Sequence, residues 1–485
     1  MPYDNLQPPA VWAHFAALNA IPRVSQNEER ARKYVIAQAE RAGLTWRGDE
    51  AGNVVVSVPA VSGIGPDTPA VCIQAHIDMV PATALGVVHD WAKDPIVARI
   101  DGGKVYATGT TLGADNGIGA AMALALMTDE TLAHGPLELL FTVEEEIGLR
   151  GASALDGSLV SARALINLDS EEIEKLTIGC TGGATLQIGI PTGRSLPRGG
   201  HIAYTLAVDG ALGGHSGLEI GKPRANAIKL LGDFLARLQA DGLAPAIAAI
   251  EGGSAANAIP KSASAVIVID KAHEGRLHAH AASFDTDALG KWRADEPGVT
   301  LTLTETDNGS EVLDPSVARK LIALIGELPH GVLQWSEMYD GKPETSANTA
   351  QITTTTSSVK VIVSVRSFLA KSLRNVRETI REKADIAGGT TQLVSQYPGW
   401  EPKSSSPLLT ATVDAYTATY GHAPEIEVVH AGLECGAIIS KLPGLDAVSF
   451  GPEIQGAHTP DECVTIDTVE STWRMLGTLL EKLAR

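Results

Sequence analysis

Cysteine is scarce in this sequence, with four copies at positions 72, 180, 435 and 463 among 485 residues. The four lie far apart and form no CxxC pair, which leaves no paired-cysteine motif. An isolated thiol in a protein of this size is typically a buried small hydrophobe. We therefore expect the cysteines to be buried and the protein to reside in a reducing cytoplasm.

Long apolar runs are also missing. The most apolar stretch, residues 118–127, covers ten residues, whereas a membrane-spanning helix needs about 20. Residues 1–5 lack the basic region and the apolar run of a secretory signal. The sequence contains no fixed-period repeat, low-complexity tract or charge block. We expect no membrane partner.

Basic residues are outnumbered, because 38 Lys and Arg face 57 Asp and Glu, a formal net charge of −19. A nucleic-acid binder needs a basic face to neutralise phosphates, so this class of protein is disfavoured. Docking on an anionic membrane surface is disfavoured for the same reason. The acidity permits a carboxylate-rich site for hard or borderline cations.

The length favours two domains, since single cores stop growing at about 250–300 residues. In the first third, strands expected at 53–58, 70–75, 137–143 and 164–168 are separated by helical stretches, including 116–127. This alternation predicts an α/β fold with a mostly parallel, helix-flanked sheet. A capping box of Ser25 as N-cap and Glu28 at N3 is expected to open a helix that ends near Ala42.

The middle of the chain has a different pattern, with two successive α+β units expected between residues 187 and 398. From residue 399 the strand–helix alternation of the first third returns. The simplest division is a first domain made of 1–186 and 399–485, interrupted by an inserted α+β domain at 187–398.

Five short segments carry acids or histidines directly after expected strands. They are residues 76–78, 113–117, 144–146, 169–172 and 456–460. Taken singly, each has a plain explanation: a hydrogen-bonded structural histidine, a solvated run of Glu, or a turn that caps a helix. In open α/β sheets, however, the carboxyl ends of the strands line the ligand crevice. We therefore expect the five segments to converge there.

Two histidines with several carboxylates form a mixed N/O ligand set that Zn²⁺ accepts. If Asp115 is shared, one ion takes His76, Asp115 and Asp169, and the other takes Asp115, Glu146 and His458. This set suits a two-metal hydrolytic centre. One further acid must stay off the metals to accept a proton from water. Asp78, two residues after His76, is a candidate to fix the histidine tautomer from behind.

These motifs resemble the co-catalytic zinc peptidases that include aminoacyl-histidine dipeptidases (peptidase D), carnosinases and peptidase T. The resemblance covers essentially the whole chain. The family's His-x-Asp is matched at 76–78, its bridging Asp at 115, its Glu-Glu-x-Gly at 145–148, its next metal Asp at 169 and its last histidine at 458. Segments 167–172, 214–217, 257–260 and 430–436 are similar to the bacterial aminoacyl-histidine dipeptidase branch.

The resemblance implies roles for these residues. Glu145 becomes the general base. Asp78, which supports the ligand His76, is the second catalytic residue. The metal ligands are His76, Asp115, Glu146, Asp169 and His458. A cis peptide often follows the bridging Asp in these enzymes. The acidic run has a Glu at position 144 where Asp is common, which leaves Glu144 as an alternative base.

Four further residues are candidates for substrate binding. By the resemblance, His215 donates a hydrogen bond to the developing oxyanion, and Arg366 holds the C-terminal carboxylate of the substrate. The plain alternatives are a Gly-rich turn at 213–217 and a surface arginine. Asn257 either contacts substrate or caps a turn, and Glu434 either faces the substrate amine or is structural.

The implied activity is a metal-dependent dipeptidase for free N-termini, including Xaa-His substrates such as β-alanyl-histidine, with Glu145 activating a water held between the metals. Two divalent ions are expected. Zn²⁺ is the preferred assignment, and Mn²⁺ or Co²⁺ are the alternatives. The insert would form a lid that restricts substrate length. The alternatives are an N-acyl amino-acid deacylase or carboxypeptidase with the same site, or a non-catalytic metal-binding protein. Small dipeptides are the expected partners, and a homodimer is compatible with the doubled insert.

Overall fold

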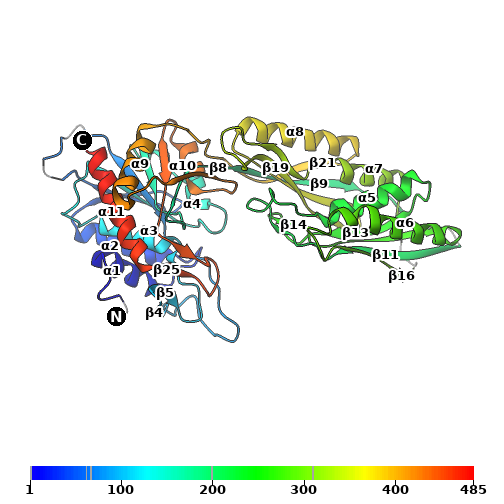
Figure 1. The fold of residues 1–485 in the computed structure, drawn as a ribbon, viewed down its shortest axis with the longest axis horizontal. Helices are drawn as coiled ribbons and strands as arrows, with labels where there is room; N and C mark the ends of the chain where they lie inside the picture. The colour runs from blue at the N-terminus through cyan, green and yellow to red at the C-terminus, as the bar shows by residue number, and fades with distance from the viewer. Residues whose placement is uncertain (1–2, 62, 66–67, 198–199, 308–310) are drawn as a thin grey trace. The chain divides into compact units, whose positions relative to one another are not determined.

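A computed structural model of the chain describes residues 3–61, 63–65, 68–197, 200–307 and 311–485. Residues 1 and 2 of the N-terminal segment considered above lie outside this description. The chain forms two compact units. The first contains residues 1–180, 400–428 and 433–485, and the second contains 181–399 and 429–432. Each unit is described separately below (Figure 1).

The first unit is built on an eight-stranded sheet. Its strands, in spatial order, are β1 (Thr45–Gly48), β2 (Val54–Val58), β6 (Leu137–Thr142), β3 (Val71–His76), β7 (Ala164–Asn167), β23 (Asp446–Ser449), β8 (Lys175–Cys180) and β22 (Glu425–Val429). The four central strands β6, β3, β7 and β23 are parallel. β1 and β2 continue the sheet in antiparallel fashion on one side. The predicted α/β class with a central parallel sheet is confirmed.

Helices accompany this sheet (Figure 1). They are α1 (Pro9–Asn19), α2 (Glu29–Arg41), α3 (Ala114–Ala125), α4 (Arg150–Ala154), α9 (Pro407–Tyr420), α10 (Glu434–Lys441) and α11 (Ile466–Leu483). A small sheet adds β24 (Ile454–Gln455), β25 (Cys463–Thr465), β5 (Lys104–Ala107) and β4 (Ala98–Asp101). Every residue of β3 and β6 is buried, as expected for strands covered on both faces.

Strand register places the site-bearing segments together. His76, the last residue of β3, pairs with Thr142 at the end of β6, and Gln74 pairs with Asn167 at the end of β7. The loops that follow these parallel strands therefore leave the same edge of the sheet. β23 brings the C-terminal part of the chain into this sheet, since Val448 pairs with Ile166.

The predicted capping box is wrong. The helix begins at Glu29, and Glu28 precedes it without a side-chain cap. Ser25 Oγ instead donates to Asp78 Oδ2 at 2.8 Å, and Glu28 Oε1 accepts from the Glu144 amide at 3.0 Å. Both side chains bond loops that follow β3 and β6. Tertiary partners have replaced the local cap that the spacing predicted.

The second unit is built on a nine-stranded sheet. Along its path lie β16 (Thr300–Thr306), β11 (His201–Asp209), β15 (Ala263–Asp270), β13 (Ala246–Gly252), β19 (Pro343–Thr354), β20 (Ser358–Ser367), β9 (Gly182–Pro191) and β21 (Thr390–Tyr397), with β18 (Gly331–Trp335) paired to β19. Two short pairs accompany it, β10 (Arg194–Ser195) with β17 (Val312–Leu313) and β12 (Gly214–His215) with β14 (Ala258–Ile259). Helices α5 (Ala227–Ala240), α6 (Glu274–Asp287), α7 (Pro315–Glu327) and α8 (Ala370–Ile386) share one buried core with the sheet.

The two α+β halves of this unit form one continuous sheet, because β13 pairs with β19 at Glu251 and Thr353. Helix α6 ends at Asp287, and a short 3₁₀ turn, Leu289–Lys291, follows it. No helix in the described ranges is long and apolar enough to cross a membrane.

Candidate metal centre and acid–base site

The bridging candidate Asp115 lies at the start of α3. The peptide bond between Asp115 and Asn116 is cis, and both residues have non-helical backbone angles, so the regular helix begins after Asn116. Asn116 Nδ2 donates to the Leu168 carbonyl at 2.6 Å, which ties this turn to the loop that carries Asp169. The predicted helix start near Asn116 is close to the observed one.

Two groups of ligand-type side chains share Asp115. Asp115 Oδ1 lies 3.1 Å from His76 Nε2, and Asp115 Oδ2 lies 3.1 Å from His458 Nε2. Asp169 Oδ1 lies 3.4 Å from His76 Nε2, and Glu146 Oε2 lies 3.0 Å from His458 Nε2. The candidate ligand atoms of each group lie within 4.8 Å of one another. The pairing of residues is the one expected from the sequence.

The donor set fits two divalent cations. Each group offers one imidazole nitrogen, one further carboxylate and one oxygen of Asp115, which is a mixed N/O set typical of zinc. Glu146 Oε1 is buried without a hydrogen-bond partner, and a buried carboxylate oxygen is costly unless something pairs with it. A cation would satisfy this atom.

The electrostatics of the cluster also favour cations. Hydrogen bonds to Asp115 and Glu146 raise the pKa of His458 to about 11. Burial lowers the pKa of His76, but the nearby carboxylates Asp169 and Asp115 outweigh it and leave this pKa well above its usual value. The same field that holds protons on the histidines attracts metal ions in their place.

Glu145 lies beside the cluster, in a group with His76 and Glu146. Burial raises the pKa of Glu145 well above its ordinary value, and the charges of Asp169, Glu434 and Glu146 add to this effect. A carboxylate with a raised pKa is a stronger proton acceptor. Glu144, the alternative base, instead pairs with Arg150 at 3.0 Å.

Asp78 lies behind both His76 and the acidic loop. Its Oδ1 is 3.4 Å from His76 Nδ1, and its two oxygens accept the backbone amides of Glu145 at 3.1 Å and Glu146 at 3.3 Å. The side chain is fully buried. Asp78 therefore links the orientation of one imidazole to the position of the two glutamates.

Glu434, at the start of α10, is fully buried. Its Oε2 accepts from Gln74 Nε2 at 2.5 Å and Thr142 Oγ1 at 2.8 Å, whereas its Oε1 has no hydrogen-bond partner. Burial raises the pKa of Glu434 to about 8. One oxygen of Glu434 is thus held by side chains of β3 and β6, and the other is without a protein partner.

The remaining candidates belong to the second unit. His215 lies in β12, where its Nδ1 accepts the amides of Gly217 at 3.3 Å and Leu218 at 3.2 Å. An accepting Nδ1 places the proton of the neutral ring on Nε2. Burial and then the charge of Arg366 lower the pKa of His215. The side chain is thus a neutral donor through Nε2.

Arg366 and Asn257 lie in the same unit as His215. Arg366, in β20, donates to Tyr397 Oη at 2.6 Å, and its Nε is buried without a partner. Asn257 is exposed, and its carbonyl accepts the Ser216 amide at 2.8 Å. Arg366 is therefore anchored by a tyrosine, and Asn257 is held beside the His215 turn.

His430 was not among the candidate site residues. It is buried beside Ser346, with Nε2 2.7 Å from Ser346 Oγ. Burial and then Arg366 lower the pKa of His430 to about 3. Folded protein thus keeps this ring neutral, while the unfolded chain protonates it below about pH 6.5. Stability linked to His430 is present above that pH and is lost on acidification.

We expect His430→Gln, which keeps a hydrogen-bonding group toward Ser346, to reduce this acid sensitivity. Between pH 7.5 and 5.0 the loss of unfolding free energy should be about 2 kcal/mol smaller than in the wild type. Urea unfolding of both metal-free proteins in EDTA at the two pH values measures it. An equal loss in both proteins would contradict the lowered pKa.

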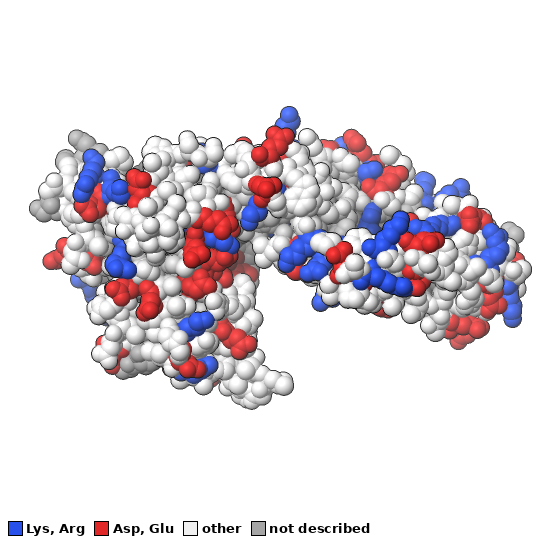
Figure 2. Space-filling view, in the orientation of Figure 1, with Lys and Arg blue, Asp and Glu red and all other residues white. Residues whose placement is uncertain are grey.

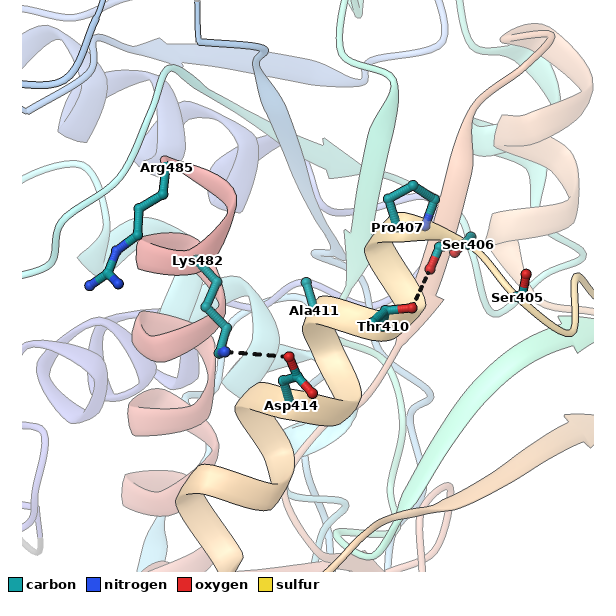
Figure 3. A pocket seen from close by; sticks show the side chains of 8 residues that line it. All are labelled: Ser405, Ser406, Pro407, Thr410, Ala411, Asp414, Lys482 and Arg485. Atoms are coloured by element: carbon teal, nitrogen blue, oxygen red, sulfur yellow. Dashed lines mark hydrogen bonds and ion pairs between the residues drawn. The ribbon is translucent and has the colours of Figure 1, made fainter.

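A groove between α9 and α11 also holds polar side chains (Figure 3). Lys482 pairs with Asp414 at 3.5 Å, and Arg485 pairs with Glu481. Ser406 already caps α9 by accepting the Leu409 amide. The groove contains none of the candidate site residues.

A sequence profile of peptidase family M20/M25/M40 matches residues 72–482. The chain belongs to this family. Over 480 residues it is 37% identical to the cytosol non-specific dipeptidase of Escherichia coli. The match covers 99% of both chains. The predicted family is confirmed.

Two solved structures resemble this chain along its whole length. Aminoacylhistidine dipeptidase from Vibrio alginolyticus gives a TM-score of 0.91 at 35% identity, covering 99% of this chain and 98% of that one. Human carnosine dipeptidase 1 gives a TM-score of 0.51 at 13% identity, covering 98% and 96%. The second likeness concerns the fold alone.

Sequence reasoning missed several residues that support this candidate site. They are Ser25, Glu28, Arg23 and Glu462, which bond the loops that carry the candidate ligands. Glu462 lies four residues after His458, just beyond the segment 456–460, and this proximity was a usable signal. Arg23 has no comparable signal, because its partners lie 54 to 90 residues further along the chain.

Proposed function

We propose that this protein is a metal-dependent dipeptidase. It hydrolyses dipeptides with a free N-terminus, including Xaa-His dipeptides such as β-alanyl-histidine. The observation that carries the proposal is the arrangement of two histidines and two further carboxylates around Asp115, with Glu145 beside them. Full-length similarity to a dipeptidase supports the substrate class.

The proposed site holds two divalent ions, with zinc first and manganese or cobalt as alternatives. His76, Asp115 and Asp169 would hold one ion, and Asp115, Glu146 and His458 the other. Bound metal would supply Lewis acidity to the scissile carbonyl and lower the pKa of a water molecule. Glu145 would take the proton from that water and deliver it to the leaving amine. Asp78 would hold Glu145 through its backbone amide.

The second unit would contribute substrate contacts. His215, as a neutral donor through Nε2, is suited to stabilise the developing oxyanion. Arg366 is suited to the C-terminal carboxylate, since a guanidinium binds a carboxylate with two parallel hydrogen bonds. Asn257 and Glu434 are proposed as further substrate contacts. In this proposal the second unit acts as the lid that limits substrate length.

A substrate panel tests the proposal. We expect metal-depleted protein to be inactive and Zn²⁺ or Mn²⁺ to restore cleavage of β-Ala-His, Gly-His and Ala-Leu, while a tripeptide and N-acetyl-Leu stay intact. Product amino acids are measured by chromatography. Cleavage of N-acetyl-Leu alone would indicate that the site belongs to an N-acyl amino-acid deacylase. No turnover with any metal would favour a non-catalytic metal-binding protein.

We also propose a cytoplasmic location. The four cysteines are free and buried, which is compatible with a reducing compartment. On the visible face of the first unit, acidic side chains gather in one area (Figure 2), in keeping with the expectation of no nucleic-acid partner. A homodimer stays a prediction, which light scattering of the purified protein would test.

A further inference from the structure

The turn that carries Asp115 is held by a buried glutamate. Glu462 is 2% exposed, and its two oxygens accept four successive backbone amides. Oε2 accepts from Leu112 at 2.8 Å and Gly113 at 3.0 Å, and Oε1 accepts from Ala114 at 2.7 Å and Asp115 at 3.2 Å. Charge-assisted bonds of this kind are stronger than neutral ones. One carboxylate thus fixes the backbone on the N-terminal side of Asp115.

A buried arginine holds the carbonyl side of the same turn. Arg23 is 1% exposed, and its Nη2 donates to the Gly113 carbonyl at 2.5 Å. Its Nη1 donates to the carbonyls of Ile77 and Asp78, each at 3.1 Å. A Cβ at Gly113 would lie 2.6 Å from Arg23 Nη2, so the close approach requires glycine there.

Together the two side chains connect three ligand-bearing segments. Arg23 joins the residues directly after His76 to the Asp115 turn, and Glu462 joins that turn to the loop of His458. The charges are opposite, and each is buried with several hydrogen-bond partners, the condition under which buried charge is tolerated. Neither side chain is among the candidate ligands.

We propose that Glu462 and Arg23 are positioning residues for the metal centre. They hold the Asp115 carboxylate at the place where both metal ions need it, and they fix it relative to the two histidines. The inference rests on the proposed metal centre but concerns residues that bind neither metal nor substrate. A residue that only stabilised the fold would leave metal affinity unchanged in the folded protein.

Glu462→Gln is the informative variant. Glutamine keeps the size of the side chain, but its NH₂ group would face backbone amides that now donate to a carboxylate oxygen. Part of the four-amide hydrogen-bond set is therefore lost. We expect metal affinity to fall about 10- to 100-fold, the range for residues that support metal ligands. Turnover at saturating metal should fall, with the KM for the dipeptide within about twofold of wild type.

Glu138→Gln is the matched control. Glu138 is a buried carboxylate of the same unit that accepts from the amides of Ser161 and Ala162 and the Ser161 hydroxyl. It lies four residues before Thr142 on β6, about 13 Å from the site end of the strand. Its loss should lower the melting temperature without changing metal affinity.

Competition with a chromophoric chelator for Zn²⁺, on variants whose circular dichroism shows a folded chain, gives the affinities. Wild-type affinity in Glu462→Gln, with a loss of melting temperature like that of Glu138→Gln, would overturn the proposal. If Glu462→Gln does not fold, Arg23→Lys decides, since lysine lacks the fork that reaches three carbonyls; unchanged affinity there overturns it. Absence of metal binding in the wild type would instead overturn the proposed function.

Discussion

Replacing Glu145 by Gln is expected to lower kcat by about 10²- to 10⁴-fold, the usual contribution of a general base. Glutamine has nearly the same shape but cannot accept a proton at neutral pH. The candidate ligands are left intact by this change, because Glu145 lies beside them in the proposed arrangement. Steady-state kinetics on β-Ala-His and Zn²⁺ titration of the same preparation measure both effects.

The adjacent Glu144 provides a matched control for this experiment. Glu144→Gln removes the same charge one residue away, but Glu144 pairs with Arg150 and belongs to no ligand group of the described residues. Its kcat should stay within about threefold of wild type, since exposed ion pairs contribute little. If Glu144→Gln lost activity and Glu145→Gln kept it, Glu144 and not Glu145 would be the general base.

Replacing Asp115 by Asn is expected to abolish detectable turnover. Each oxygen of Asp115 faces a different imidazole, so loss of its charge weakens both proposed metal sites at once. Residues that only support metal ligands cost about 10- to 100-fold in affinity, and a shared ligand should exceed this range. Equilibrium dialysis followed by metal analysis gives the stoichiometry and affinity.

Asp461→Asn is the control for that variant. Asp461 is an exposed acid three residues after His458, and the change removes one negative charge from the same neighbourhood. We expect unchanged stoichiometry and activity. Two tightly bound ions in Asp115→Asn would show that Asp115 does not bridge the site, whatever its activity.

The central strands and the convergence of polar segments were predictable. Strands β3 and β6 are buried on both faces, so their sequences are mostly apolar and easily recognised. Residues at the ends of parallel strands must leave the sheet at one edge, which is why His76 and the acids after β6 and β7 could be placed together. The motifs also predicted which residues lie together in each of the two groups that share Asp115.

Other features had no local pattern to reveal them. The N-cap expected at Ser25 failed because its hydroxyl bonds Asp78, 53 residues away. The insert was expected as two α+β units, but the pairing of β13 with β19 joins residues about 100 positions apart into one sheet. Local spacing predicts local hydrogen bonds, but it does not reveal a partner that tertiary packing brings close.

The sequence by itself determined which residue types stand at the ends of buried strands, and hence the family and the kind of chemistry. The tertiary structure decided what holds those residues in place. Glu462 bonds amides nearly 350 positions earlier in the chain, and Arg23 bonds carbonyls that follow two different strands. Such contacts arise only when the chain has folded, because a buried charge takes whatever backbone groups the packing brings within reach.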